Sequence, residues 1–285
     1  MAPREPSKPL LSFSRQNVIS ELAEQVASIH SLSVRVNPIE IAHAKHITNS
    51  FGPYGDGFDG MLEHKSGRFH IYLNGQRLET IGSARSRFTV AHELGHYFID
   101  EHRLALQSGR VPAHGSRCEF ESRNLVEQEA DLFASNLLMP PLRFVPAARK
   151  VPLGLPGVLK LAVDFGVSLT SAAIRYCNSD VLACAVIKWG QDGYSWKMLS
   201  TETFRQQYRK TIESKDKIPR QSATALALTG KPIPPEGFFQ TGATAASWFP
   251  YVDSKSYRNA IIIEQAIPLG RFGVLTFLYP DSGSF

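Results

Sequence analysis

Two histidines four residues apart, in the run His92-Glu93-Leu94-Gly95-His96, restrict this chain more than any other feature. On a helix, His92 and His96 stand one turn apart on one face, where both imidazoles can reach the same metal ion. Glu93 lies one step around the helix, where it is not a ligand but can act as a base on a nearby water molecule. This HExxH spacing is typical of zinc-dependent hydrolases. It predicts a helix that carries a metal site.

Apolar residues around the motif predict that this helix is buried, because they recur at three- and four-residue steps. They are Phe88, Ala91, Leu94, Gly95, Phe98 and Ile99. Ser83 and Ser86 are both candidates for the N-cap. Gly95 costs a helix about 1 kcal/mol relative to alanine, which is understandable if another element or a substrate approaches closely there. The alternative is a core helix with two hydrogen-bonded histidines, and it is disfavoured because burying unpaired polar groups costs several kcal/mol.

The third metal ligand has two candidate positions, since a catalytic zinc ion normally takes three protein ligands and leaves one position for water. His102 falls where an extended HExxHxxGxxH motif places its last histidine, but that motif needs a glycine where this chain has Ile99. If the helix continues, His102 points away from the face of His92 and His96. We then expect His102 to be an exposed residue near the helix end.

Glu127 is the favoured third ligand. It lies in a second helical segment, from Val126 to Pro140, whose apolar residues build one face. Glu127 and Asp131 are four residues apart and share a face, so Glu127 can bind the metal while Asp131 holds the outer nitrogen of a ligand histidine. A solvated acidic first turn is the alternative, and Glu129 fits it better than Glu127 does. Glu129 and His102 are the fallback ligands.

With both segments considered, the chain resembles the ImmA/IrrE family of bacterial and phage metallopeptidases. The resemblance covers about residues 15–177 and rests on two runs, residues 87–97 and 127–140. It implies a zinc peptidase of the gluzincin kind, whose known members cut repressors of the helix-turn-helix class and so relieve repression. It also implies that generic peptides are cut poorly.

Carried over residue by residue, the resemblance makes His92 and His96 ligands, Glu127 the third ligand and Glu93 the catalytic base. At position 131 the chain departs from the pattern, because family members often have asparagine where this chain has Asp131.

The predicted cofactor is therefore Zn²⁺ and the predicted reaction is hydrolysis of a peptide bond. Glu93 would accept the proton of the attacking water and deliver it to the leaving amine. One further donor would stabilise the oxyanion, and the candidates for it are Tyr97, His102 and His114.

Length and composition are those of a globular protein with two domains. The chain has 285 residues, of which 43% are hydrophobic and 20% charged, ordinary values that allow a substantial core. No apolar run has the length of a membrane span or of a signal-peptide core, so we expect a short disordered leader and a cytoplasmic location. The net charge of +5 permits only weak attraction to nucleic acid. Three cysteines form no pairing framework or ligand motif, which indicates reduced thiols: Cys118, Cys177 and Cys184.

We predict an α+β fold with four segments. After a leader at residues 1–14, a zincin-like, mainly helical peptidase domain with a small sheet spans residues 15–155. A helix-turn-helix-like helix pair follows at 156–178, and a C-terminal α+β domain at 179–285. The second helix of the pair offers few side chains that read bases, so packing is favoured over DNA binding. The C-terminal domain lies where the family sometimes carries a GAF-like sensor, although nothing in its residues identifies a ligand.

A hairpin is predicted around Lys65-Ser66-Gly67, leading into an alternating strand at residues 68–73. In zinc peptidases of this general kind, such a strand near the motif helix often has a free edge that pairs with an extended substrate. We therefore expect residues 68–73 to bind substrate by strand addition.

Two other classes of function stay open. One is a regulator that binds DNA or protein and whose metal site is structural or vestigial; strongly salt-dependent affinity for duplex DNA would be its signature. The other is a metal-dependent hydrolase that acts on a non-peptide substrate.

Overall fold

The computed structural model describes residues 11–78, 80–110, 115–116, 124–190, 193–200, 202–208, 211–252 and 255–281. Contacts within the chain divide it into two compact units. The first is Met1–Phe144 with Val163–Ser168, and the second is Val145–Ala162 with Leu169–Phe285. The predicted helix pair at 156–178 thus contributes to both. Each unit combines helices with one sheet, which confirms the predicted α+β class.

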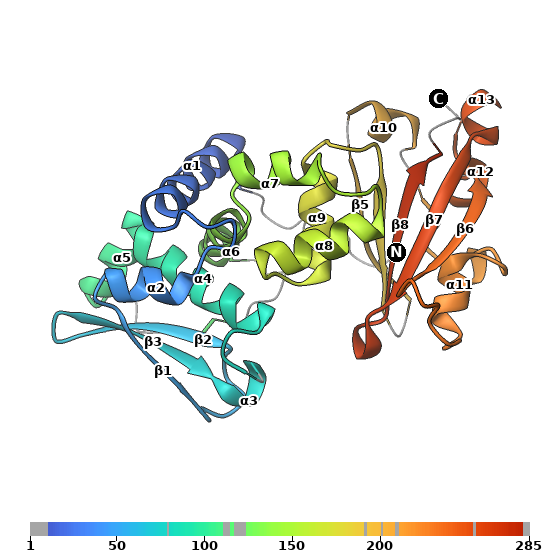
Figure 1. The fold of residues 1–285 in the computed structure, drawn as a ribbon. Helices are drawn as coiled ribbons and strands as arrows, with labels where there is room; N and C mark the ends of the chain where they lie inside the picture. Colours follow the sequence, from blue (N-terminus) through green and yellow to red (C-terminus); the bar gives the residue numbers. More distant parts are fainter. Residues whose placement is uncertain are drawn as a thin grey trace, which may run out of the picture. The chain divides into compact units, whose positions relative to one another are not determined.

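The first unit contains helices α1 to α6 and the smaller, three-stranded sheet (Figure 1). Its elements are α1 (Phe13–His30), α2 (Pro38–Ala44), β1 (Thr48–Gly52), β2 (Gly60–Lys65), β3 (Arg68–Asn74), α3 (Gly75–Leu78), α4 (Ala84–Phe98), α5 (Asp100–Gln107) and α6 (Leu125–Leu138). Side-chain caps set several of the helix starts. Of the two serines considered for the motif helix α4, Ser83 is the cap and accepts a hydrogen bond from the Ser86 N–H. Asn124 caps α6 in the same way.

Helix α4 forms the core of this unit. It packs on β2 and β3 on one side and on α6 on another, and α6 in turn packs on α1 (Figure 1). Every residue from Thr89 to His96 is buried. An all-round buried helix of this kind is held by its neighbours rather than by one amphipathic face.

Gly95 is the point where α4 and α6 come closest. A Cβ atom there would lie 3.0 Å from the Ala130 Cα and 3.2 Å from the Ala130 carbonyl oxygen. Both atoms belong to the backbone of α6, which cannot move aside on its own. The close approach expected at Gly95 is therefore made by a helix of the same chain.

The three-stranded sheet has the order β1-β3-β2, so β3 is its central strand. It runs parallel to β1 and antiparallel to β2. The prediction that residues 68–73 offer a free edge is therefore wrong, because both edges of β3 are already paired. The sequence pattern missed β1, since Thr-Asn-Ser-Phe-Gly does not alternate and its partner is 22 residues away in β3 (Thr48 pairs with His70).

Strand β2 is an edge strand, and its backbone orientation follows from its first residue. The Gly60 carbonyl accepts a hydrogen bond from the Ser116 N–H at 2.8 Å, on the side away from β3. Because orientation alternates along an antiparallel pair, the N–H and C=O groups of Leu62 and His64 also point away from β3.

The second unit is built on a five-stranded antiparallel sheet of order β5-β4-β8-β7-β6 (Figure 1). Its elements are α9 (Leu169–Asn178), β4 (Ala185–Trp189), β5 (Tyr194–Leu199), α10 (Glu202–Gln207), η1 (Lys215–Lys217), α11 (Ala223–Leu228), β6 (Phe239–Thr244), α12 (Ala245–Trp248), α13 (Lys255–Asn259), β7 (Ile261–Pro268), η2 (Gly270–Phe272) and β8 (Val274–Pro280). The strand pairs β4–β5 and β7–β8 are antiparallel hairpins. Cys177 and Cys184 are buried free thiols, whereas Cys118 lies outside the described residues.

Two helices contribute to both units: α7 (Pro141–Ala148) and α8 (Leu155–Phe165). Helices α8 and α9 form the predicted helix pair and are bent by 112° at their junction. Among the described residues, no single helix is long and apolar enough to cross a membrane, while this bent pair together meets that criterion of length and composition.

Replacing Gly95 with alanine tests the contact between α4 and α6. Alanine favours a helix by about 1 kcal/mol, but overpacking a tight core costs about 1–3 kcal/mol. Since the obstructing atoms are backbone, we expect Gly95→Ala to lower the free energy of unfolding in denaturant titrations. Gly57→Ala is the control, because a Cβ atom there meets nothing within 4 Å. A Gly95→Ala variant as stable as wild type would contradict the tight contact.

Candidate metal centre

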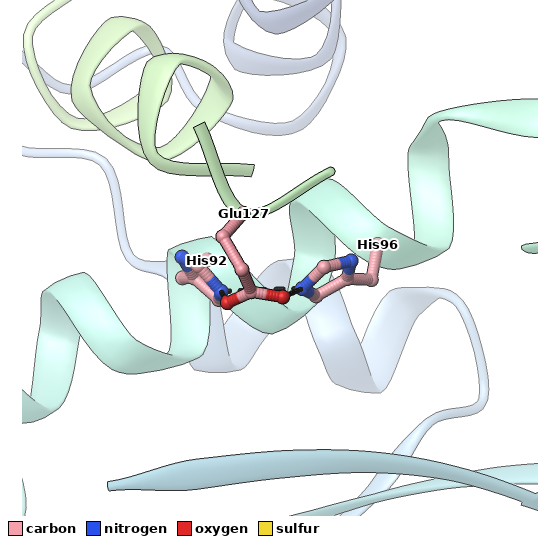
Figure 2. Close-up of side chains that lie close together, drawn as sticks. All are labelled: His92, His96 and Glu127. Carbon is pink, nitrogen blue, oxygen red and sulfur yellow. Dashed lines mark hydrogen bonds and ion pairs between the residues drawn. The ribbon is translucent and has the colours of Figure 1, made fainter. Parts of the chain in front are cut away.

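Helices α4 and α6 bring the side chains of His92, His96 and Glu127 together (Figure 2). The two histidine Nε2 atoms are 3.1 Å apart. The Glu127 carboxylate lies against both imidazoles, with Oε2 3.2 Å from His92 Nε2 and Oε1 3.5 Å from His96 Nε2. In the part of the chain that the structure describes, no other group of histidine, cysteine or acidic residues meets this spacing.

The spacing of these donor atoms fits one small divalent cation. Zinc binds imidazole nitrogen and carboxylate oxygen at about 2.0–2.2 Å in tetrahedral sites, which places neighbouring ligand atoms about 3.3–3.6 Å apart. The observed separations run from 3.1 to 3.5 Å. Two neutral imidazoles and one carboxylate are also the donor set of many catalytic zinc sites. The residues present therefore fit such an ion.

Charge around His92 favours a cation at the same place. Burial lowers the pKa of His92, but hydrogen bonds with Asp131 and Glu127 outweigh burial and raise the pKa to about 10. Glu93 adds a further negative charge nearby. Carboxylates that hold a proton on a buried imidazole would hold a divalent cation in its place, and metal binding would release the proton.

Asp131 lies at the outer nitrogen of His92. Its Oδ1 is 2.8 Å from His92 Nδ1. When the imidazole is neutral, a proton on Nδ1 donates to Asp131 and leaves the Nε2 lone pair directed at Glu127 and His96. A partner of this kind fixes both the tautomer and the orientation of a ligand histidine.

Glu93 is buried where β2 crosses α4. A Cβ atom on Gly60 would lie 2.9 Å from Glu93 Oε1 and would collide with the Thr89 side chain. Glycine at position 60 therefore lets the start of the edge strand pass directly over the carboxylate of Glu93. The arrangement sets the predicted base beside the first residue of the edge strand β2, where Gly60 pairs with Ser116.

His102 occupies a different place from the one expected. Helix α4 ends at Phe98 and α5 begins at Asp100, so the chain turns at Ile99 without a glycine. His102 is only 8% exposed, and the prediction of an exposed residue is wrong. Its Nδ1 lies 3.2 Å from His96 Nδ1, behind that ring and away from Glu127.

The other nitrogen of His102 faces Glu129, with Nε2 3.0 Å from Oε2. Neither ring nitrogen is thus left to face an oxyanion. Burial lowers the pKa of His102, which keeps the ring neutral. Burial raises the pKa of Glu129, but the hydrogen bond and charge of Arg15 outweigh it and lower that pKa overall. The sequence pattern did not connect Arg15 with the site, since it lies far away along the chain.

Of the two other oxyanion candidates, the structure describes only Tyr97. The Tyr97 ring packs edge-on against Phe69, with ring centroids 5.1 Å apart, and lines a surface pocket together with His43 and Arg68. His114 lies outside the described residues.

Residues 79–176 match the Peptidase_M78 family model, described as the IrrE N-terminal-like domain. This part of the chain is similar to the ImmA/IrrE family. The matched range includes His92, His96 and Glu127, and it confirms the resemblance found in the sequence. The peptidase description of the family supports a metallopeptidase.

Over nearly the whole chain, the similarity to a solved structure is a similarity of fold alone. A solved structure of a Mycobacterium tuberculosis transcriptional regulator superposes with a TM-score of 0.57 at 13% sequence identity, covering 94% of this chain and 79% of that chain. A search of curated proteins gives no match.

Removal of the Glu127 carboxylate tests the centre directly. We expect wild type to retain close to one zinc ion per chain after mild dialysis against a chelator, and Glu127→Ala to lose it, because two imidazoles alone hold zinc weakly. The measurement is metal content by elemental analysis. Glu21→Ala, an exposed glutamate on α1, is the matched control. Full retention of zinc by Glu127→Ala would exclude this ligand scheme.

Proposed function

We propose that this chain is a zinc-dependent endopeptidase that cleaves a transcriptional repressor of the helix-turn-helix class and so relieves repression. The observation that carries the proposal is the group of three donor atoms, spaced for one tetrahedral ion and lying beside a buried glutamate in an IrrE-like domain. In this scheme His92, His96 and Glu127 are the ligands, Asp131 orients His92, and Glu93 is the base.

The mechanism assigns the proton transfers to Glu93. When bound, zinc would supply Lewis acidity and lower the pKa of a coordinated water to about 7. Glu93 accepts the proton of the attacking water and delivers it to the leaving amine. Because Glu93 is 1% exposed, its carboxylate acts in a low-dielectric site where charge interactions are strong.

Substrate binding is proposed at the outward edge of β2. Leu62 and His64 direct their N–H and C=O groups away from β3, and the strand starts at Gly60, directly over Glu93. An extended peptide would pair with this edge at Leu62 and His64, next to Ser116, which already pairs with Gly60 beside the proposed base. The outward edge of β2 would pair with the backbone of any extended peptide, so the selectivity for one protein substrate must come from contacts elsewhere.

Two points support a regulatory substrate. Known members of the family that the chain resembles cut repressors, and the structural neighbour is named a transcriptional regulator. Such a substrate places the reaction in the cytoplasm. We propose the second unit as a sensory, GAF-like domain that controls the peptidase.

A second candidate function is a regulator that binds DNA through α8 and α9. The bend of 112° between these helices agrees with the 90–120° of helix-turn-helix motifs. Salt-dependent binding of duplex DNA by the Glu93→Gln variant would favour this candidate, because that variant separates binding from cleavage.

The Glu93→Gln variant also tests the assigned base. We expect it to keep its metal and to lose about 10²–10⁴-fold in turnover, since glutamine is isosteric but cannot accept the proton. Cells expressing wild type or Glu93→Gln would be compared for new protein N-termini by mass spectrometry, and the cleaved protein would then be assayed with purified enzyme. Cleavage by Glu93→Gln at the wild-type rate would refute the role of Glu93.

Proline at position 64 tests the substrate edge. His64→Pro removes one outward N–H, and proline is tolerated on edge strands, so metal content should stay unchanged. We expect cleavage of the protein substrate to fall at least tenfold, mainly through KM. His64→Ala is the control, because it removes the side chain and keeps the N–H. Equal loss in both variants would attribute the effect to the imidazole instead.

A further inference from the structure

Behind the His96 ring, side chains from three other helices form a continuous hydrogen-bonded row. His96 Nδ1 is 3.2 Å from His102 Nδ1, on α5. His102 Nε2 is 3.0 Å from Glu129 Oε2, on α6. Arg15, on α1, donates to both oxygens of Glu129, from Nε at 2.8 Å and from Nη2 at 2.7 Å. The row therefore runs from the metal cluster to the N-terminal helix.

Only one arrangement of protons satisfies every member of this row when His96 Nε2 faces a metal ion. The His96 proton then sits on Nδ1 and donates to His102 Nδ1, which must accept. His102 therefore carries its proton on Nε2 and donates it to the Glu129 carboxylate. That carboxylate is held in turn by the two N–H groups of Arg15. A neutral histidine has one donor and one acceptor nitrogen, and here each finds the partner it needs.

We propose that His102 is a positioning residue for His96, and that Glu129 and Arg15 fix its tautomer. The inference rests on the proposed function, in which His96 is a ligand. Arg15 lies outside residues 79–176, so α1 becomes part of the metal centre's support. The turn at Ile99 supplies the geometry, because it returns α5 toward His96 instead of extending α4.

The two ligand histidines are thus oriented by different means. His92 faces a carboxylate directly, through Asp131 at 2.8 Å. His96 faces a neutral imidazole, and the carboxylate stands one residue further out. The partner of an imidazole N–H usually changes metal affinity about 10–100-fold when it is removed. His102 should therefore affect metal retention without being a ligand.

Two substitutions at position 102 separate positioning from packing. His102→Leu fills the space without an acceptor, while His102→Asn can place an amide oxygen where Nδ1 stands. We expect His102→Leu to weaken zinc affinity about 10–100-fold in chelator competition and to alter the visible spectrum of the cobalt-substituted protein. His102→Asn should restore affinity to within about threefold of wild type. Wild-type affinity and spectrum in His102→Leu would overturn the proposal.

A measurement on the wild-type protein avoids the risk that a variant misfolds. Long-range ¹H–¹⁵N correlation NMR of the zinc-loaded chain reports which ring nitrogen carries the proton. We expect the proton on Nδ1 of His96 and on Nε2 of His102. A proton on Nδ1 of His102 would overturn the proposal, because that nitrogen could not then accept from His96.

These readouts separate this proposal from the proposed function. If wild type binds one zinc ion and Glu127→Ala does not, while His102→Leu behaves as wild type, the positioning role fails and the metal centre stands. If wild type binds no zinc under any loading condition, the proposed metal centre is wrong, and the positioning role of His102 is wrong as well. If His102→Leu alone abolishes binding and Glu127→Ala retains it, His102 is a ligand and not a positioning residue.

Discussion

The close approach of α4 and α6 at Gly95 is the constraint on which the metal centre depends. Glu127 has to reach two imidazoles on α4 with one carboxylate, so α4 and α6 must pack closely against each other. Glycine makes this possible, because any Cβ at that position would press on the backbone of Ala130. The same contact sets Asp131 against His92 and turns Glu129 toward His102. A single small residue between the two histidines thus positions three acidic groups of α6.

Burying the polar groups of α4 is costly, and the structure compensates with partners arranged outside the cluster. His92, Glu93 and His96 are all nearly inaccessible to solvent, and an unpartnered polar group in such a place costs several kcal/mol. Asp131 offsets this cost for one histidine. The row from His102 to Arg15 offsets it for the other. Networks of this type are stable only when each member has its hydrogen-bond partners. This explains why side chains of α1 and α5 hydrogen-bond around a metal site to which neither helix contributes a ligand.

Much of the local structure follows from short-range patterns. The motif helix, the helix that carries Glu127 and the hairpin β2–β3 are all predicted, because helix and hairpin signals lie within a few residues of each other. Strand β1 was not predicted, because it pairs with β3 in parallel and this pairing joins residues far apart in the chain. For the same reason the substrate edge was assigned to β3, although β3 is the central strand and β2 is an edge strand of the three-stranded sheet.

The sequence by itself determined the candidate site residues of this protein: an HExxH helix, an acidic helix with Glu127 four residues before Asp131, and a resemblance of residues 79–176 to the ImmA/IrrE family. These features are local, and helix periodicity alone decides which side chains share a face. Only the tertiary structure decided the place of His102. Its position depends on a turn at Ile99 that no glycine marks, and on Arg15 and Glu129, which come from two other helices. Contacts between distant segments have no signature in spacing, because packing and not periodicity brings them together.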